Sequence, residues 1–346
     1  MPFFRRTSIV LLAALTLVSC RRDPNVVKQQ YLDSGNKYFD HGRYKQAAIQ
    51  YQNAIKIDRK FGPAYYRLAL VYMKMTPPQI NTAIHQFRRA VELLEGNQAY
   101  QEEYKASLVQ LSELDLAFLA RDRTVLKDVE DYCAILFKKD PNSFEATRLT
   151  GDLNFTKYLQ AGEAGPTVAN GFLDTAMEYY RKADAIKPGD VGVLLQIGKI
   201  LARQKQYAEA EPYFRRVIDT DKTSYLGIMN LYTVYMTEQK TADAEKLLKE
   251  AIQNNPKSHE YLERLAYHYG TLGRRDDMLN VLAQIKSHAK DFEAVYRVVG
   301  DFYYRIGDVE SAKKSLNTVL QIDPNHKDAQ RSIDEIKKLE TAAKGS

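Results

Sequence analysis

The chain has 346 residues, more than one compact core usually organises, so two domains or an array of repeats is expected. Hydrophobic residues make up 45% of the sequence and charged residues 27%, which excludes a mostly disordered chain. The formal net charge of +6 is too small over this length to indicate a nucleic-acid-binding surface. The 2 cysteines cannot form a disulfide framework.

The first twenty residues have the profile of a signal peptide. Arg5 and Arg6 precede an apolar run over residues 9–18, which ends at Ser19 and Cys20. At a rise of about 1.5 Å per residue, this run spans roughly half of a hydrocarbon core of about 30 Å, so it is too short for an ordinary transmembrane helix. One interpretation of this profile is a secretory signal whose apolar run ends at a cysteine by chance.

The tetrapeptide Leu17-Val18-Ser19-Cys20 resembles the lipobox of bacterial lipoproteins. The resemblance implies that residues 1–19 are removed and that Cys20 is acylated, which holds the protein on a lipid bilayer. Arg21 stands where the sorting rules of that family need Asp for inner-membrane retention, so the resemblance implies the outer membrane, facing the periplasm. Residues 20–27 are predicted to form a lipidated tether, because Pro24 opposes a helix and helical periodicity starts after it.

The body of the chain repeats with a period of 34 residues. Small or ring-bearing residues recur at this interval at Gly198, Tyr232, Ala266 and Gly300, and twelve residues after each come Ala210, Ala244, Met278 and Ala312. This pattern resembles the tetratricopeptide repeat, a pair of helices in which small residues allow close packing. The resemblance implies an all-α fold, a right-handed α-solenoid of about eight helix pairs in which each pair covers the apolar face of its neighbour.

The repeat register divides residues 28–343 into helix-pair units and a capping helix. The units are 28–61, 62–97, 110–143, 144–189, 191–224, 225–258, 259–292 and 293–326, followed by a cap over 327–343. The third unit is degenerate, because Val129 and Leu136 stand where Ala is expected. The cap carries Ile333, Ile336 and Leu339 at helical spacing with charged residues elsewhere, a pattern typical of a one-sided helix that ends an array.

The fourth unit carries 13 extra residues between Gly151 and Ala176. The stretch QAGEAGPTVANG contains three Gly and one Pro, so the excess is predicted to form a loop over residues 156–172 between the two helices. This loop is either a tolerated surface insertion or a functional loop that reaches over a groove.

Motifs of enzymes are missing from the sequence. It contains no Walker, dinucleotide-binding, H-E-x-x-H or G-x-S-x-G motif, and its 6 His show no metal-ligand spacing. Cys133 lies in a helical pattern where packing favours an apolar side chain, so a buried free thiol is expected. We therefore expect no enzyme activity, cofactor or metal. A remote alternative is an envelope enzyme with a site near Cys133 and the 156–172 loop.

The first helix of each unit is expected to line the concave face of the solenoid, where proteins of the resembled family bind peptides or helices of partners. Candidate partner-binding residues are those of first helices that are not expected to serve packing. They are Asn36, Phe39, Asp40, Tyr66, Leu70, Met73, Lys74, Lys199, Arg203, Met229, Thr233, Met236, Tyr267, Arg297, Asp301, Tyr304 and Arg305. Their aromatic, Met and basic groups suit an amphipathic or acidic segment.

Some family members hold a carboxyl terminus of their partner with Lys and Asn. Asn36 matches that Asn, but Leu32 stands in place of the Lys, which disfavours this binding mode.

These features together predict a membrane-anchored scaffold that binds protein partners in a bacterial envelope assembly, with no role for nucleic acid. The lipobox-like segment followed by the first repeat, residues 31–58, resembles the lipoproteins found with PEP-CTERM protein sorting and exopolysaccharide export. An alternative is an assembly factor for a pilus, a secretin or an outer-membrane protein complex.

Replacing Cys20 with alanine is expected to release the protein from membranes, because the acyl chains on this residue would be its anchor. Fractionation of cells into membrane and soluble material measures the effect. Mass spectrometry that finds residues 1–20 intact and unmodified in the mature protein would contradict the prediction.

Overall fold

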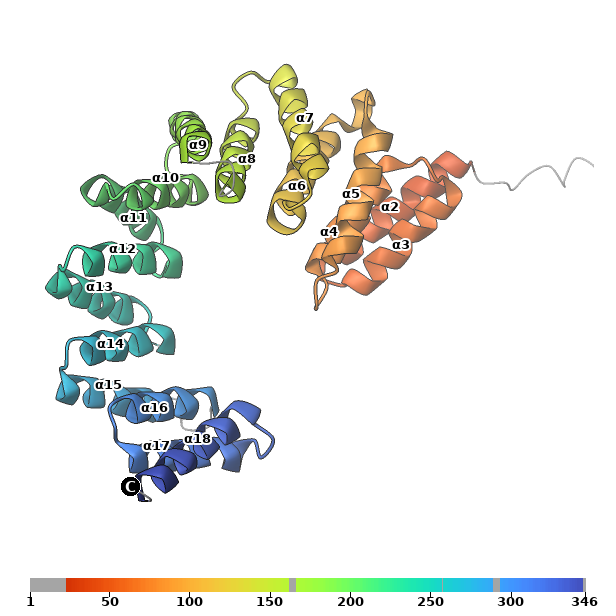
Figure 1. The fold of residues 1–346 in the computed structure, drawn as a ribbon. Helices are drawn as coiled ribbons and strands as arrows, with labels where there is room; N and C mark the ends of the chain where they lie inside the picture. The colour runs from red at the N-terminus through yellow and green to blue at the C-terminus, as the bar shows by residue number, and fades with distance from the viewer. Residues whose placement is uncertain (1–22, 162–165, 257, 289–292, 345–346) are drawn as a thin grey trace, which may run out of the picture. The chain divides into compact units, whose positions relative to one another are not determined.

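The computed structural model describes residues 23–161, 166–256, 258–288 and 293–344 (Figure 1). The regular elements in these ranges are helices, and no strand occurs among them, which confirms the predicted all-α class. No helix in the described ranges is both long enough and apolar enough to cross a membrane. The chain divides into two compact units, Met1–Pro188 and Gly189–Ser346, which we call unit 1 and unit 2.

Consecutive helices form antiparallel pairs in each unit, and each helix packs mainly on the helices before and after it. Unit 1 contains α2 (Pro24–Asp40), α3 (Tyr44–Ile57), α4 (Gly62–Lys74), α5 (Ile80–Leu94), the 3-10 helix η1 (Gln98–Tyr100), α6 (Gln101–Leu114), the π-helix η2 (Asp115–Leu119), α7 (Arg123–Lys139), α8 (Phe144–Gln160) and α9 (Pro166–Ile186). Unit 2 contains α10 (Val191–Arg203), α11 (Tyr207–Thr220), α12 (Tyr225–Thr237), α13 (Thr241–Asn254), α14 (His259–Thr271), α15 (Arg275–His288), α16 (Glu293–Arg305), α17 (Val309–Ile322) and α18 (Lys327–Lys344).

A glycine on the first helix of a pair lets the second helix approach closely. A Cβ atom added to Gly198 of α10 would lie 2.6 Å from the Phe214 ring of α11, closer than real Cβ contacts. The same relation joins Gly35 to the ring of Tyr51. The rings of Tyr51 and Phe214 are fully buried, so the space beside each glycine is filled by the partner helix.

The predicted tether over residues 20–27 is too long, because α2 already begins at Pro24. Proline is tolerated in the first turn of a helix, where its missing N–H would have had no partner. The side chain of Asp23 caps this turn by accepting a hydrogen bond of 2.9 Å from the backbone N–H of Asn25. Proline was therefore a helix-start signal at this position and not a breaker.

The loop predicted over residues 156–172 is wrong for most of that range. Helix α8 continues to Gln160 and α9 begins at Pro166, so the described part of the segment is mainly helical. The extra residues lengthen the pair, which has helices of 17 and 21 residues where α10 and α11 have 13 and 14. Residues 162–165 of the predicted loop lie outside the described residues.

The capping helix α18 covers the last helix pair. Ile333 and Ile336 are buried with Ala329 against α17, as the sequence predicts. Leu339 does not join them, since 57% of its surface is exposed. At 3.6 residues per turn, Leu339 lies off the helix face that Ala329, Ile333 and Ile336 share, although α17 and α18 are still in contact there through Lys313 and Glu340.

The degenerate third repeat, residues 110–143, contains a buried carboxyl group. Asp115 begins the π-helix η2, and its side chain has no exposed surface. Its Oδ1 accepts a hydrogen bond of 3.1 Å from Nη2 of Arg88, whereas its Oδ2 has no hydrogen-bond partner among the described residues. Burial raises the pKa of Asp115 to about 6, although the charge and hydrogen bond of Arg88 act in the opposite direction.

Replacing Gly198 with leucine is expected to lower the free energy of unfolding by at least about 1–3 kcal/mol, because the Phe214 ring occupies the space that the side chain needs. Urea unfolding followed by circular dichroism measures the change. The matched control is Gly171→Ala on α9, where a Cβ would meet nothing within 4 Å and a gain of about 0.5–1 kcal/mol is expected. Unfolding of Gly198→Leu at the wild-type urea concentration would show that the contact is not tight.

Asp115 is expected to make the protein less stable as the pH rises from about 5 to about 7. Its pKa in the folded protein, about 6, exceeds the value of roughly 3.9 in an unfolded chain, so folding favours the protonated carboxyl, and this contribution is lost as the pH rises through 6. Asp115→Asn cannot ionise and should lack this part of the pH dependence, about 1 kcal/mol over that range. Thermal unfolding at a series of pH values tests this, with Asp131→Asn on the exposed face of α7 as control. Equal pH dependence in the wild type and both variants would contradict the prediction.

Candidate functional site: a pocket on the first helices of unit 2

The candidates that the sequence places on the first helices of unit 1 mostly serve packing. Tyr66, Leu70 and Met73 are partly buried against a core cluster of α4, α5 and α6, and Phe39 packs edge to face on Tyr44 with ring centroids 5.5 Å apart. The expectation that these four residues are free of packing was therefore wrong. Neighbouring helices cover them, because the second helix of each pair and the first helix of the next share one core.

The remaining candidates of unit 1 are polar. Asn36 already accepts a hydrogen bond of 2.9 Å from the hydroxyl of Tyr51, so its oxygen has a structural partner. Asp40 and Lys74 are exposed at the ends of α2 and α4.

Unit 2 brings three of the predicted residues together. Tyr267 on α14 and Asp301 and Arg305 on α16 line a pocket of about 400 Å³, which we call the α14 pocket. The other lining residues, which sequence analysis did not select, are Tyr225, Glu260, Glu263, Arg264 and Phe302. They come from α12, α14 and α16, the first helices of three successive pairs.

Helix periodicity places the lining residues of α14 on one face. Glu260, Glu263, Arg264 and Tyr267 follow the i, i+3, i+4, i+7 spacing of a single helix face. Tyr267 and Asp301 are separated by one 34-residue period, so they occupy the same position in successive repeats. The missed residues of α14 could have been found from this spacing together with the position of Tyr267.

Aromatic side chains form the exposed walls of the α14 pocket. Tyr225 and Tyr267 each have 41% of their surface exposed. The ring of Tyr225 lies 6.0 Å from that of Tyr261, a buried residue, so it is supported from behind. The guanidinium of Arg264 lies 5.7 Å from the ring centroid of Tyr267 and 5.8 Å from that of Tyr232.

The charges of the α14 pocket are only partly compensated within the protein. Burial raises the pKa of Glu263, although His259, Arg297 and Arg264 act in the opposite direction. Burial also raises the pKa of Asp301. Arg297, which pairs with Asp301 at 3.2 Å, and the charge of Arg305 both lower this pKa in part. Both carboxyl groups would thus gain from a further positive partner.

The other candidates of unit 2 lie around this pocket or away from it. Lys199 on α10 is half-buried, and burial together with the charge of Arg203 lowers its pKa. Met229 and Met236 on α12 are partly covered, and the hydroxyl of Thr233 donates a hydrogen bond to the carbonyl of Met229 in its own helix. Tyr304 packs against the core cluster of α17 and α18, which corrects its assignment as a residue free of packing.

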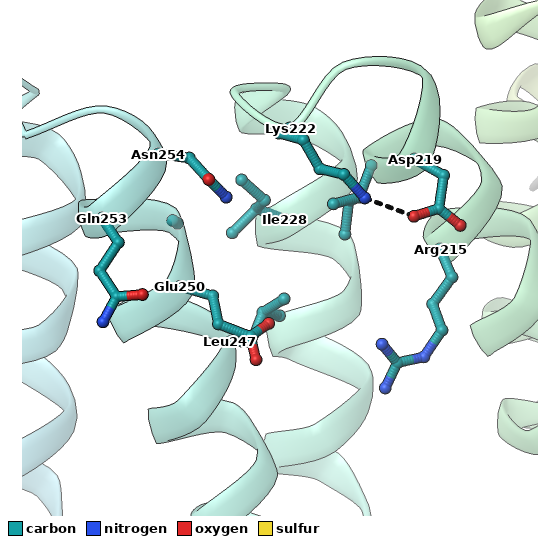
Figure 2. Close-up of a pocket in the computed structure, with 10 residues that line it drawn as sticks. Arg215, Asp219, Lys222, Ile228, Leu247, Glu250, Gln253 and Asn254 are labelled. Atoms are coloured by element: carbon teal, nitrogen blue, oxygen red, sulfur yellow. Dashed lines mark hydrogen bonds and ion pairs between the residues drawn. The ribbon is translucent and has the colours of Figure 1, made fainter.

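A second hollow lies between α11, α12 and α13 (Figure 2). Its volume is about 290 Å³, and its base is formed by apolar residues such as Ile228 and Leu247. Lys222 points toward Asp219, with which it forms an ion pair of 2.6 Å, and Arg215 pairs with Glu211 at 2.8 Å. Because these charges already have partners, this hollow is a weaker candidate than the α14 pocket.

A catalytic or metal site finds little support in the described part of the chain. Cys133 is buried, and burial raises the pKa of its thiol to about 11, so the sulfur stays protonated near neutral pH and is a poor nucleophile. Within the described ranges, no group of three or more His, Cys, Asp or Glu side chains could hold a metal ion. Cys20, the predicted lipidation site, lies outside the described residues.

Comparison with protein-family models identifies tetratricopeptide repeats in both units. Residues 35–75 match a model of the TPR repeat, and residues 191–224 and 295–326 match a model of the tetratricopeptide repeat. The chain therefore contains repeats of this type, as the 34-residue period predicts.

Comparison with characterised proteins gives more distant similarities. The protein O-mannosyl-transferase TMTC3 of Homo sapiens is 25% identical over 257 residues, which cover 68% of this chain and 27% of that protein. The match thus spans about a quarter of the relative.

Two solved structures show similarity in fold. PilF of Pseudomonas aeruginosa is 17% identical with a TM-score of 0.49, covering 71% of this chain and 100% of that one. PilW, described as a widely conserved type IV pilus biogenesis factor, is 18% identical with a TM-score of 0.44, covering 69% of this chain and 100% of that one.

Proposed function

We propose that this protein is a scaffold of the bacterial cell envelope that binds a segment of a protein partner on the first helices of unit 2. The observation that carries the proposal is the α14 pocket, where two exposed tyrosines stand beside incompletely compensated charges. Exposed aromatic side chains in a pocket supply much of the binding energy of protein interfaces. The tetratricopeptide repeats support the same function, because stacked helix pairs present extended surfaces to partners.

Membrane anchoring is a finer part of this proposal and rests on the sequence. The tetrapeptide Leu17–Cys20 would place acyl chains at Cys20, directly before the described part of the chain. A scaffold anchored in this way would hold its partner at the periplasmic face of the outer membrane. The anchor would then restrict the partner to the membrane surface and raise its local concentration there.

The pathway served by the scaffold is proposed on the resemblance of the N-terminal sequence. The lipobox-like segment and residues 31–58 favour exopolysaccharide export or PEP-CTERM protein sorting. The alternative remains the assembly of a pilus, a secretin or an outer-membrane protein complex. The identity of the partner decides between them, because export and pilus systems contain different proteins.

Replacing Tyr225 and Tyr267 together with alanine is expected to weaken partner capture by roughly a hundredfold, because two exposed aromatic anchors are removed from the α14 pocket. The measurement is crosslinking in intact cells, followed by purification of the tagged full-length protein and quantification of crosslinked partners by mass spectrometry. The melting temperature should change little, since both side chains are well exposed.

The matched control replaces Ile322 and Leu339, apolar residues of α17 and α18 that are 43% and 57% exposed, with alanine. These changes remove a similar exposed apolar surface outside the α14 pocket, so partner capture should be unchanged. Loss of capture in the control and normal capture in the tyrosine variant would place the binding surface elsewhere and contradict the proposal.

A further inference from the structure

We propose that the α14 pocket receives a basic side chain, arginine or lysine, from the bound partner segment. This inference rests on the proposed function and specifies the chemistry of the partner. The pocket of about 400 Å³ falls within the range of volumes typical for ligand sites. Its walls combine the exposed rings of Tyr225 and Tyr267 with three carboxyl groups, Glu260, Glu263 and Asp301.

The aromatic walls suit a cation. A guanidinium or ammonium group over the face of a tyrosine ring gains roughly 0.5–2 kcal/mol, and the larger values apply where water is displaced. The protein already uses this contact within the lining of the pocket, where Arg264 lies 5.7 Å from the ring centroid of Tyr267. The exposed ring of Tyr225 offers a second aromatic surface to a group that enters from outside.

The carboxyl groups of the pocket lack strong partners of their own. The only cationic group within 4.0 Å of Glu263 among the described residues is Nε2 of His259, which is charged only when protonated and lies at that limit. Glu260 is exposed and forms no ion pair within the described part of the chain. Burial raises the pKa of both Glu263 and Asp301, which means that their charged forms are incompletely compensated.

The two arginines that line the pocket form no direct ion pair with these carboxyl groups, although their charges lower the pKa of Glu263 and of Asp301 in part. Arg264 is placed over the rings of Tyr232 and Tyr267, and neither Arg264 nor Arg305 forms an ion pair of 4.0 Å or less with a described residue. Arg297, which lies just outside the lining, is paired with Asp301. The lining thus carries three carboxyl groups against two guanidinium groups, so its formal charge is negative and favours a basic group over an acidic one.

The mixed charge of the lining therefore favours a basic residue over the acidic segment suggested by the sequence. The sequence-based selection contained Arg297, Asp301 and Arg305 but not Glu260 or Glu263, so it overestimated the positive charge of this surface. The tertiary structure adds the two glutamates and Arg264, because all three share the face of α14 that carries Tyr267.

The test uses the full-length protein and two synthetic probes, acetyl-Ala-Ala-Arg-Ala-Ala-amide and its counterpart with Glu in place of Arg. We expect the Arg peptide to bind with a dissociation constant in the millimolar range, measured by NMR titration, and the Glu peptide to bind at least about tenfold more weakly. The double variant Glu260→Gln with Glu263→Gln should lose about tenfold or more in affinity for the Arg peptide. Glutamine preserves the size of the side chains, and thermal unfolding checks that the fold is kept.

The matched charge control is Arg305→Gln, which removes a positive charge from the same pocket. Affinity for the Arg peptide should stay equal or increase. Tighter binding of the Glu peptide, loss of binding in Arg305→Gln, or no detectable binding of the Arg peptide would each overturn the inference. If the tyrosine variant described above still loses its crosslinked partner in that case, the proposed function stands and only the chemistry assigned to the pocket is wrong.

Discussion

The close approach of two helices at a glycine is the contact on which four helix pairs of this protein depend. Gly35 faces Tyr51, Gly198 faces Phe214 and Gly300 faces Leu316, and in each case the two residues are 16 positions apart. In the lengthened pair the same contact joins Gly151 to Tyr180, although 13 more residues lie between them. The insertion lengthens the C-terminal end of α8 and the N-terminal end of α9 and leaves the contact between Gly151 and Tyr180 unchanged. A closely packed core accommodates extra residues at the ends of its helices more easily than a change of volume at a buried contact.

Neighbouring pairs are joined by polar contacts as well as by shared apolar cores. The hydroxyl of Tyr235 on α12 donates to Glu211 on α11 at 2.6 Å, and the hydroxyl of Tyr269 on α14 donates to Glu245 on α13 at 2.9 Å. Each pair of residues is 24 positions apart, and the second pair follows the first by one 34-residue period. Hydrogen bonds from Lys249, Tyr269 and Arg274 hold the pKa of Glu245 at about 2 although burial opposes ionisation, so this carboxylate stays charged at neutral pH and fixes α14 relative to α13.

The α14 pocket follows from this fixed register. Because successive first helices are related by one period, residues that are 34 positions apart occupy equivalent positions, and Tyr267 of α14 and Asp301 of α16 both line the pocket. The change from an aromatic ring to a carboxyl group at this position makes the site local on an otherwise repetitive surface. Binding specificity in such an array arises where the repeat positions differ, while the positions that are the same maintain the packing.

The sequence by itself determined the all-α class, the 34-residue period and the residues that bring paired helices together, because these features are local in the chain and recur in most of the repeat units. It did not determine which side chains of the first helices are free of packing contacts. Phe39, Tyr66, Leu70 and Met73 became packing residues only when the adjacent helices covered them. Pro24 and Pro166 were ambiguous, since proline both breaks a helix and begins one, and the tertiary structure placed each in a first turn. The pocket charges were decided in the same way, because burial of Glu263 and Asp301 depends on helices from three successive repeats.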